Sequence, residues 1–185
     1  MKKQAWLILT IIAFIAGLAL AATNMITAGP IEEQRVKAIL EARAAVFPAA
    51  DNFVELPLDA DSSFDSIVEA MSGTQRIGYI FQLSVAGYAG PIEIIMGVDT
   101  QGTVSGISVG GSKFSETAGL GTKVKLPAFT DQFIGLSEMP VLNGNVDTIS
   151  GATVSSSAVI NGVIRIYTQW EATSAADPSA GSVSP

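Results

Sequence analysis

The N-terminal segment constrains this chain more than any other feature, because residues 4–31 carry no charged side chain. Residues 5–22 within it are almost wholly apolar. About 20 apolar residues in a helix span the ~30 Å hydrocarbon core of a bilayer. We therefore expect residues 1–30 to form a cytoplasmic N-terminus and a single transmembrane anchor in the cell (inner) membrane. The basic Lys2 and Lys3 place the N-terminus in the cytoplasm and the rest of the chain on the extracytoplasmic side.

A cleaved signal peptide is the alternative interpretation of this segment. Two lysines, the apolar residues 6–18 and the small-x-small sequence Ala19-Leu20-Ala21 fit that pattern. However, the apolar run continues past Ala21 to Ile26, and a charged helical pattern follows directly. These two features favour an anchor that is retained.

Composition then excludes most chemistry that the chain could perform unaided. The 185 residues include no Cys and no His, which removes thiolate nucleophiles, iron–sulfur clusters, Ser-His-Asp triads and histidine metal sites. No metal site is expected. The net charge is −7, and about −9 beyond residue 30, which argues against nucleic-acid binding. Redox or group-transfer chemistry would need a bound cofactor.

Three regions follow the anchor. Residues 31–48 predict a helical stalk that ends at Pro48, with Glu33 and Lys37 as an i,i+4 charge pair. Residues 49–171 form the folded domain, and residues 172–185, rich in Ser, Ala, Gly and Pro, are expected to be a disordered tail. The domain begins with a turn-rich acidic stretch, residues 49–65, that lacks a calcium-loop motif and is interpreted as a solvated face.

The domain is predicted to be α+β, with an antiparallel sheet flanked by helices. Its four β-like runs are rich in Ile, Val, Tyr and Phe and are separated by short Gly, Pro or Asp turns, which favours a meander: residues 66–71, 76–86, 92–98 and 103–109. A short helix is expected over residues 127–135. A last helix runs from about 153 to 170 with an apolar stripe that includes Val159, Val163 and Ile166.

Two segments have a composition that suits ligand binding. In residues 113–122, glycines on both sides of Leu120 allow positive φ and a close approach of the backbone to a flat ligand. Residues 147–153 (DTISGAT) lead into the last helix, where free N–H groups and the helix dipole attract anions. On these grounds alone, an ordinary turn is the favoured interpretation of the first segment and an ordinary helix cap that of the second. Neither contains a P-loop or a G-x-G-x-x-G motif.

The combination of the two segments resembles a known family. Asp147-x-x-Ser150-Gly151-Ala152-Thr153 resembles the D-x-x-[ST]-G-A-[TS] signal at which a flavin transferase attaches FMN to the final Thr or Ser. Residues 116–122 (ETAGLGT) are similar to the E-T-P-G-L-G segment of the same FMN-binding domains, with Ala118 where Pro is usual. With its N-terminal anchor, the chain resembles the G subunit of the Rnf ion-translocating ferredoxin:NAD oxidoreductase. The C subunit of the Na⁺-translocating NADH:quinone oxidoreductase, typically longer, shares the domain.

The resemblance implies roles for individual residues. Thr153 would carry FMN through a phosphoester, and Asp147 would serve recognition by the flavin transferase. No residue of the chain would be catalytic by itself. The remaining cofactor-binding residues would surround the phosphate, the ribityl chain and the isoalloxazine ring: Ser150, Gly151, Ala152, Glu116, Thr117, Gly119, Leu120, Gly121 and Thr122.

The function implied by the resemblance is electron transfer within a complex that translocates Na⁺ or H⁺. Its partners would be the lipid bilayer, the flavin transferase and the other membrane and redox subunits. A different class of function, a membrane-anchored binding or structural domain, would make Thr153 only a helix cap. A hydrolase that uses Lys113 or Lys123 has no motif to support it.

Overall fold

The structure is a computed structural model that describes residues 2–59 and 61–176. The chain divides into two compact units, Met1–Leu40 and Glu41–Pro185. Helix α1 (Lys2–Val46) belongs to both units and continues through Pro30. It therefore joins the predicted anchor and stalk into one helix, and it ends just before Pro48, as the proline predicts.

The first unit contains the apolar part of α1, a helix long and apolar enough to cross a membrane. Its large side chains, from Trp6 to Ile26, are all exposed. The hydroxyl groups of Thr10, Thr23 and Thr27 donate to the carbonyl oxygens four residues earlier, each at 2.9 Å. Such internal pairing removes polar groups that lipid could not satisfy. The predicted apolar helix is thus present, and its length and composition suit both an anchor and a signal sequence.

The second unit is built on a five-stranded antiparallel sheet whose strands follow one another in chain order. The predicted runs correspond to four of them: β2 (Ser66–Ser72), β3 (Gln75–Ala86), β4 (Pro91–Asp99) and β5 (Val104–Gly110). The sequence interpretation missed β1 (Asn52–Glu55), which pairs with β2 inside the acidic stretch. This edge strand is mostly exposed, so it has no apolar alternation by which it could be recognised.

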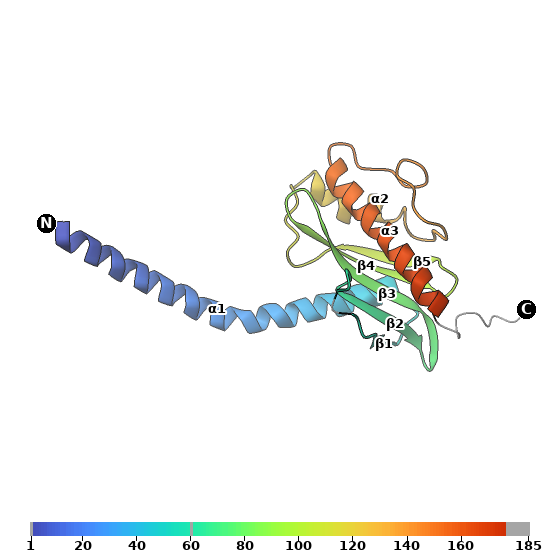
Figure 1. The fold of residues 1–185 in the computed structure, drawn as a ribbon, viewed down its shortest axis with the longest axis horizontal. Helices are drawn as coiled ribbons and strands as arrows, with labels where there is room; N and C mark the ends of the chain where they lie inside the picture. Colours follow the sequence, from blue (N-terminus) through green and yellow to red (C-terminus); the bar gives the residue numbers. More distant parts are fainter. Residues whose placement is uncertain (1, 60, 177–185) are drawn as a thin grey trace, which may run out of the picture. The chain divides into compact units, whose positions relative to one another are not determined.

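Helix α3 (Thr153–Ala176) lies across β3 and β4 and covers one face of the sheet (Figure 1). Val159, Val163 and Ile166 are fully buried there, which confirms the predicted stripe. A Cβ atom at Gly162 would collide with Ile94, so this glycine lets the helix approach the sheet closely. The helix continues past its predicted end into residues 172–176, and the rest of the predicted tail lies outside the described residues.

Residues 111–152 connect the sheet to α3. They include the 3₁₀ helix η1 (Gly121–Lys125) and α2 (Pro127–Thr130). The helix predicted over residues 127–135 is wrong beyond Thr130, because the chain turns through positive φ at Gly135. Phe129 and Phe133 still meet, with ring centroids 5.4 Å apart in an edge contact, and both are buried.

The opposite face of the sheet holds the chain that leaves α1. The ring of Phe47 lies against Gly78 and Gly97, where a Cβ atom would come within 2.6 Å and 2.9 Å of it. A Cβ at Gly106 would lie 2.8 Å from the Cα of Val46. Ser105 Oγ also donates to the Val46 carbonyl at 2.7 Å. The glycines of three adjacent strands therefore form a slot for residues 46–47, which we call the glycine slot.

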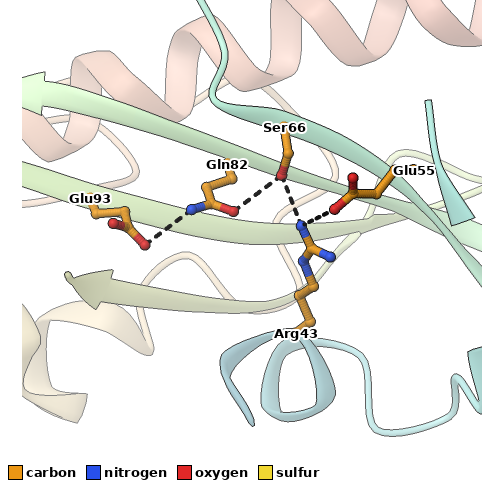
Figure 2. Close-up of polar contacts among 5 residues, drawn as sticks. All are labelled: Arg43, Glu55, Ser66, Gln82 and Glu93. Carbon is orange, nitrogen blue, oxygen red and sulfur yellow. Dashed lines mark hydrogen bonds and ion pairs between the residues drawn. The ribbon is translucent and has the colours of Figure 1, made fainter. Parts of the chain in front are cut away.

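Beside the glycine slot, a row of polar side chains crosses the sheet (Figure 2). Arg43 Nη2 donates to Glu55 Oε1 at 3.1 Å and to Ser66 Oγ at 3.0 Å. Ser66 Oγ donates to Gln82 Oε1, and Gln82 Nε2 donates to Glu93 Oε1, both at 3.1 Å. The row gives Arg43 Nη2 and the buried Gln82 side chain partners on successive strands, while Arg43 Nε is buried without a hydrogen-bond partner. It ties the last turn of α1 to β1, β2, β3 and β4.

On the α3 side, Tyr167 is a buried titratable group. Its hydroxyl donates to the Leu136 carbonyl at 2.8 Å. Burial raises the pKa of Tyr167 from 10.0 to about 12, and the negative charges of Asp99 and Glu138 act in the same direction. The folded state therefore holds this proton more tightly than the unfolded chain does. The resulting stabilisation is complete below pH 10 and is lost as the pH rises to about 12.

We predict that the free energy of unfolding falls between pH 10 and about 12 and that Tyr167→Phe makes this fall shallower. Chemical unfolding at a series of pH values measures it. Tyr88→Phe is the control, because that tyrosine is 72% exposed and should leave the fall intact. Equal pH dependence in Tyr167→Phe and the unmodified chain would contradict the assignment.

Candidate functional site

A cavity of about 500 Å³ lies at the N-terminus of α3. This volume is within the range of small-molecule and cofactor sites. Its lining comes from the hairpin between β3 and β4, the segment before η1, and the first turn of α3: Tyr88, Glu116, Thr117, Leu120, Gly121, Gly151, Ala152, Thr153, Val154 and Ser155. The two segments singled out from the sequence therefore meet in one cavity.

The glycine-rich segment forms one wall through a tight local turn. Gly119 has φ +75°, and its N–H donates to Thr122 Oγ1 at 2.9 Å. The N–H groups of Leu120 and Thr122 both donate to the Thr117 carbonyl at 3.2 Å. This turn presents Leu120, which is 44% exposed, to the cavity. Gly119 and Thr122 shape the turn but do not line the cavity.

Residues 151–155, at the start of α3, form the facing wall. Gly151 has φ +79°, a conformation that favours glycine, and Leu120 Cδ2 lies 3.5 Å from where its Cβ would be. Ile149 N–H donates to Ser156 Oγ at 3.1 Å, and Ala152 N–H donates to the Ile149 carbonyl at 2.9 Å. These bonds hold the residues before α3 against its first turn. Thr153 begins that helix and is exposed in the cavity.

A buried carboxylate joins the walls. Glu116 is 6% exposed. Its Oε1 accepts the Ala89 N–H at 3.0 Å, and its Oε2 accepts the Ser155 hydroxyl at 2.6 Å. A Cβ at Gly87 or Gly121 would collide with this carboxylate. Glu116 therefore contacts the β3–β4 hairpin, the turn before η1 and the first turn of α3 at once.

The structure adds side chains that sequence reasoning missed. Tyr88, Val154 and Ser155 line the cavity, and Tyr88 and Val154 are largely exposed there. Tyr88 lies in a turn between strands, where an aromatic residue between Gly87 and Gly90 was the available signal. Ser155 resembles an ordinary first-turn serine, and only its contact with Glu116 distinguishes it.

Asp147 and Ser150 lie apart from these lining residues. Asp147 borders a second groove of about 420 Å³ together with Lys123, Gln132 and Thr148. Its backbone N–H donates to Gln132 Oε1 at 2.8 Å. Ser150 is exposed and lines neither space. If a flavin transferase recognises Asp147, as the resemblance implies, it would contact a surface other than the cavity that Thr153 lines.

The cavity fits a flavin phosphate by its chemistry. Gly121, Gly151 and Ala152 are small, the first-turn N–H groups of α3 have no intrahelical acceptors, and Leu120 and Val154 offer exposed apolar surface. No Lys or Arg is among the lining residues, so the charge of a phosphate would be met by backbone N–H groups and not by an ion pair.

Comparison with known proteins places the same region in one family. The FMN-binding domain matches residues 87–168, which contain Tyr88, Glu116 and Thr153. The G subunit of the Na⁺-translocating ferredoxin:NAD⁺ oxidoreductase complex of Acetobacterium woodii is 32% identical over 187 residues, covering 87% of this chain and 89% of the relative.

A further curated relative and a solved structure are similar to this chain at lower identity. The G subunit of an ion-translocating oxidoreductase complex of Methanosarcina acetivorans is 29% identical over 163 residues, covering 83% of this chain and 86% of the relative. The crystal structure of the C subunit of a Na⁺-translocating NADH-quinone reductase from Parabacteroides distasonis has 23% identity and a TM-score of 0.48. It covers 63% of this chain and 73% of that chain.

Proposed function

Because this chain belongs to the G-subunit family of ion-translocating ferredoxin:NAD⁺ oxidoreductase complexes, we propose that it carries electrons on an FMN covalently attached to Thr153. The chain is one subunit of an oxidoreductase complex and an FMN-binding protein of electron transport. The proposal adds the covalent bond, the residue that carries it, and the side of the membrane on which it lies.

One observation carries the proposal. The Thr153 hydroxyl lies at the first position of α3 and is exposed in a cavity whose lining residues include no lysine or arginine. A freely exchanging FMN would have to hold its phosphate without an ion pair. A phosphoester to Thr153 removes that requirement, because the bond itself retains the cofactor. The remaining negative charge lies where the N–H groups and dipole of α3 are favourable.

The chain's residues take distinct roles in this site. Bound FMN supplies the reversible uptake and release of electrons. Thr153 retains it, Gly151 and Ala152 leave space for the phosphate, and Leu120 with Val154 covers apolar ring surface. Gly119 and Thr122 support the wall that carries Leu120 from outside the cavity. The chain contains no histidine or cysteine, so the redox chemistry of the site would be supplied by the flavin.

The membrane helix gives this carrier its location. The apolar N-terminal helix fits a membrane-anchored subunit. We propose that the flavin domain lies on the extracytoplasmic side, because the basic Lys2 and Lys3 precede the apolar part of the helix. Its partners there are the other subunits of the complex, and a flavin transferase that recognises Asp147 loads it. A covalent bond suits a carrier in a compartment from which lost FMN would diffuse away.

An intact-mass measurement on the protein purified from its native membrane tests the proposal. The expected mass is that of the full chain plus one FMN joined with loss of water. A chain with an intact N-terminus and no added mass would overturn covalent attachment and favour a binding or structural role. A chain shortened after Ala21 would overturn the retained anchor.

A further inference from the structure

The carboxylate of Glu116 is the feature of the cavity that attachment of FMN leaves unexplained. It is buried, and within the described residues no lysine or arginine forms an ion pair with it. Both oxygens accept hydrogen bonds, one from Ala89 N–H and one from the Ser155 hydroxyl, which is the pattern of an ionised carboxylate. A buried charge without a cation is costly to folding, so its presence calls for a reason.

The position of Glu116 supplies one mechanical consequence. Its Oε1 holds the β3–β4 hairpin that carries Tyr88, and its Oε2 holds the first turn of α3 just after Thr153. Gly87 and Gly121 leave free the space that the carboxylate occupies, because a Cβ atom at either position would collide with it. The Glu116 side chain thus fixes the distance between the first turn of α3, which bears Thr153, and the β3–β4 hairpin, which carries Tyr88.

The same position has an electrostatic consequence. The carboxylate lines the cavity that would contain the flavin, and burial lets its field act with little screening by water. A fixed negative charge close to a flavin disfavours the more negatively charged reduced form, and nearby charge is a recognised means by which proteins adjust a cofactor. The N-terminal dipole of α3 offsets part of this charge and makes its burial tolerable.

We propose that Glu116 is a positioning residue of the flavin site whose buried negative charge keeps the reduction potential of the bound flavin low. This inference rests on the proposed function, because it concerns a flavin in the cavity that Thr153 lines. It assigns to Glu116 a role through the pocket walls and the electric field, in place of the direct cofactor contact that the resemblance implies.

The first test is redox potentiometry of the full flavin-loaded chain in detergent. Glu116→Gln keeps the size and shape of the side chain and removes its charge, so we expect a shift of the midpoint potential to more positive values. Glu138→Gln is the matched control, because this exposed glutamate lies near Tyr167, fourteen positions along α3 from Thr153. A midpoint unchanged in Glu116→Gln, or shifted equally in both variants, overturns the electrostatic role.

Ser155→Ala separates charge from position. It removes the donor to Oε2 and keeps the carboxylate, so it should leave the midpoint closer to that of the unmodified chain than Glu116→Gln does. A shift in Ser155→Ala as large as that in Glu116→Gln would show that the hydrogen bond, and not the charge, sets the potential. That result would overturn the proposal.

A second measurement needs no flavin. Hydrogen–deuterium exchange of the Ala89 amide in the full chain should become about tenfold faster in Glu116→Ala, which corresponds to losing one hydrogen bond to a charged group. Unchanged exchange overturns the positioning role. If the intact mass shows no FMN, the proposed function fails, while this exchange experiment still decides whether Glu116 joins the walls.

Discussion

Replacing Thr153 by alanine is expected to abolish covalent flavin, so that the denatured chain migrates in gels without the fluorescence of the unmodified protein. The variant lacks the only atom to which the proposed phosphoester is attached. Thr153 is exposed at the first position of α3, so its loss should change the free energy of unfolding by no more than about 0.5 kcal/mol. The loss of flavin is therefore expected in a folded protein.

Two further variants make this result specific. Thr148→Ala removes a hydroxyl from the same segment, but Thr148 borders the second groove and should keep the fluorescent band. Thr153→Ser keeps a hydroxyl at the attachment position and should also give a fluorescent band. All chains should be produced with an active flavin transferase. A fluorescent Thr153→Ala band would place the flavin on another residue.

Replacing Phe47 by alanine is expected to have the largest effect on stability, lowering the free energy of unfolding by about 3–5 kcal/mol. The ring is 5% exposed and packs against glycines, so no neighbouring side chain can extend to refill the space. Chemical unfolding of the full chain in detergent measures the loss. Trp170 fluorescence, in a Trp6→Phe background, reports on the packed domain, because Trp170 lies over Gly102.

Val54→Ala is the matched control for this prediction. Val54 is 43% exposed on the edge strand β1, so its truncation should cost far less than that of Phe47. Gly106→Ala tests the glycine slot from the opposite side, since its Cβ would lie 2.8 Å from the Val46 Cα, and overpacking of this kind costs about 1–3 kcal/mol. Similar losses in Phe47→Ala and Val54→Ala would show that the slot contributes little.

Elements with a local composition or period could be predicted from the sequence, and those that depend on distant partners could not. The strands β2 to β5 were predicted from runs of β-branched and aromatic residues between short turns, and the buried stripe of α3 from its helical period. The edge strand β1 was missed because it is mostly exposed. The glycine slot was missed because Gly78, Gly97 and Gly106 become neighbours only through strand pairing.

The residues of the site also fall into those that a local sequence pattern indicates and those that only the fold brings to the site. The pattern from Asp147 to Thr153 and the Gly119-Leu120-Gly121 turn could be recognised as local signals, and Leu120, Gly121 and Thr153 do line one cavity. Tyr88 carries only the weak signal of an aromatic residue in a glycine turn, and Ser155 carries none, since a serine in the first turn of a helix is common. Asp147 lies at a separate groove, which its position in a linear motif could not show.

By itself, the sequence determined the long apolar helix, the order of the strands, the absence of histidine and cysteine chemistry, and the hydroxyl at the start of α3. These features depend on composition or on residues close together in the chain. Only the tertiary structure decided that Glu116 contacts Ala89 and Ser155 and that residues 46–47 rest in a slot of glycines. Such contacts join residues far apart in sequence, and their geometry exists only once the strands and α3 have packed.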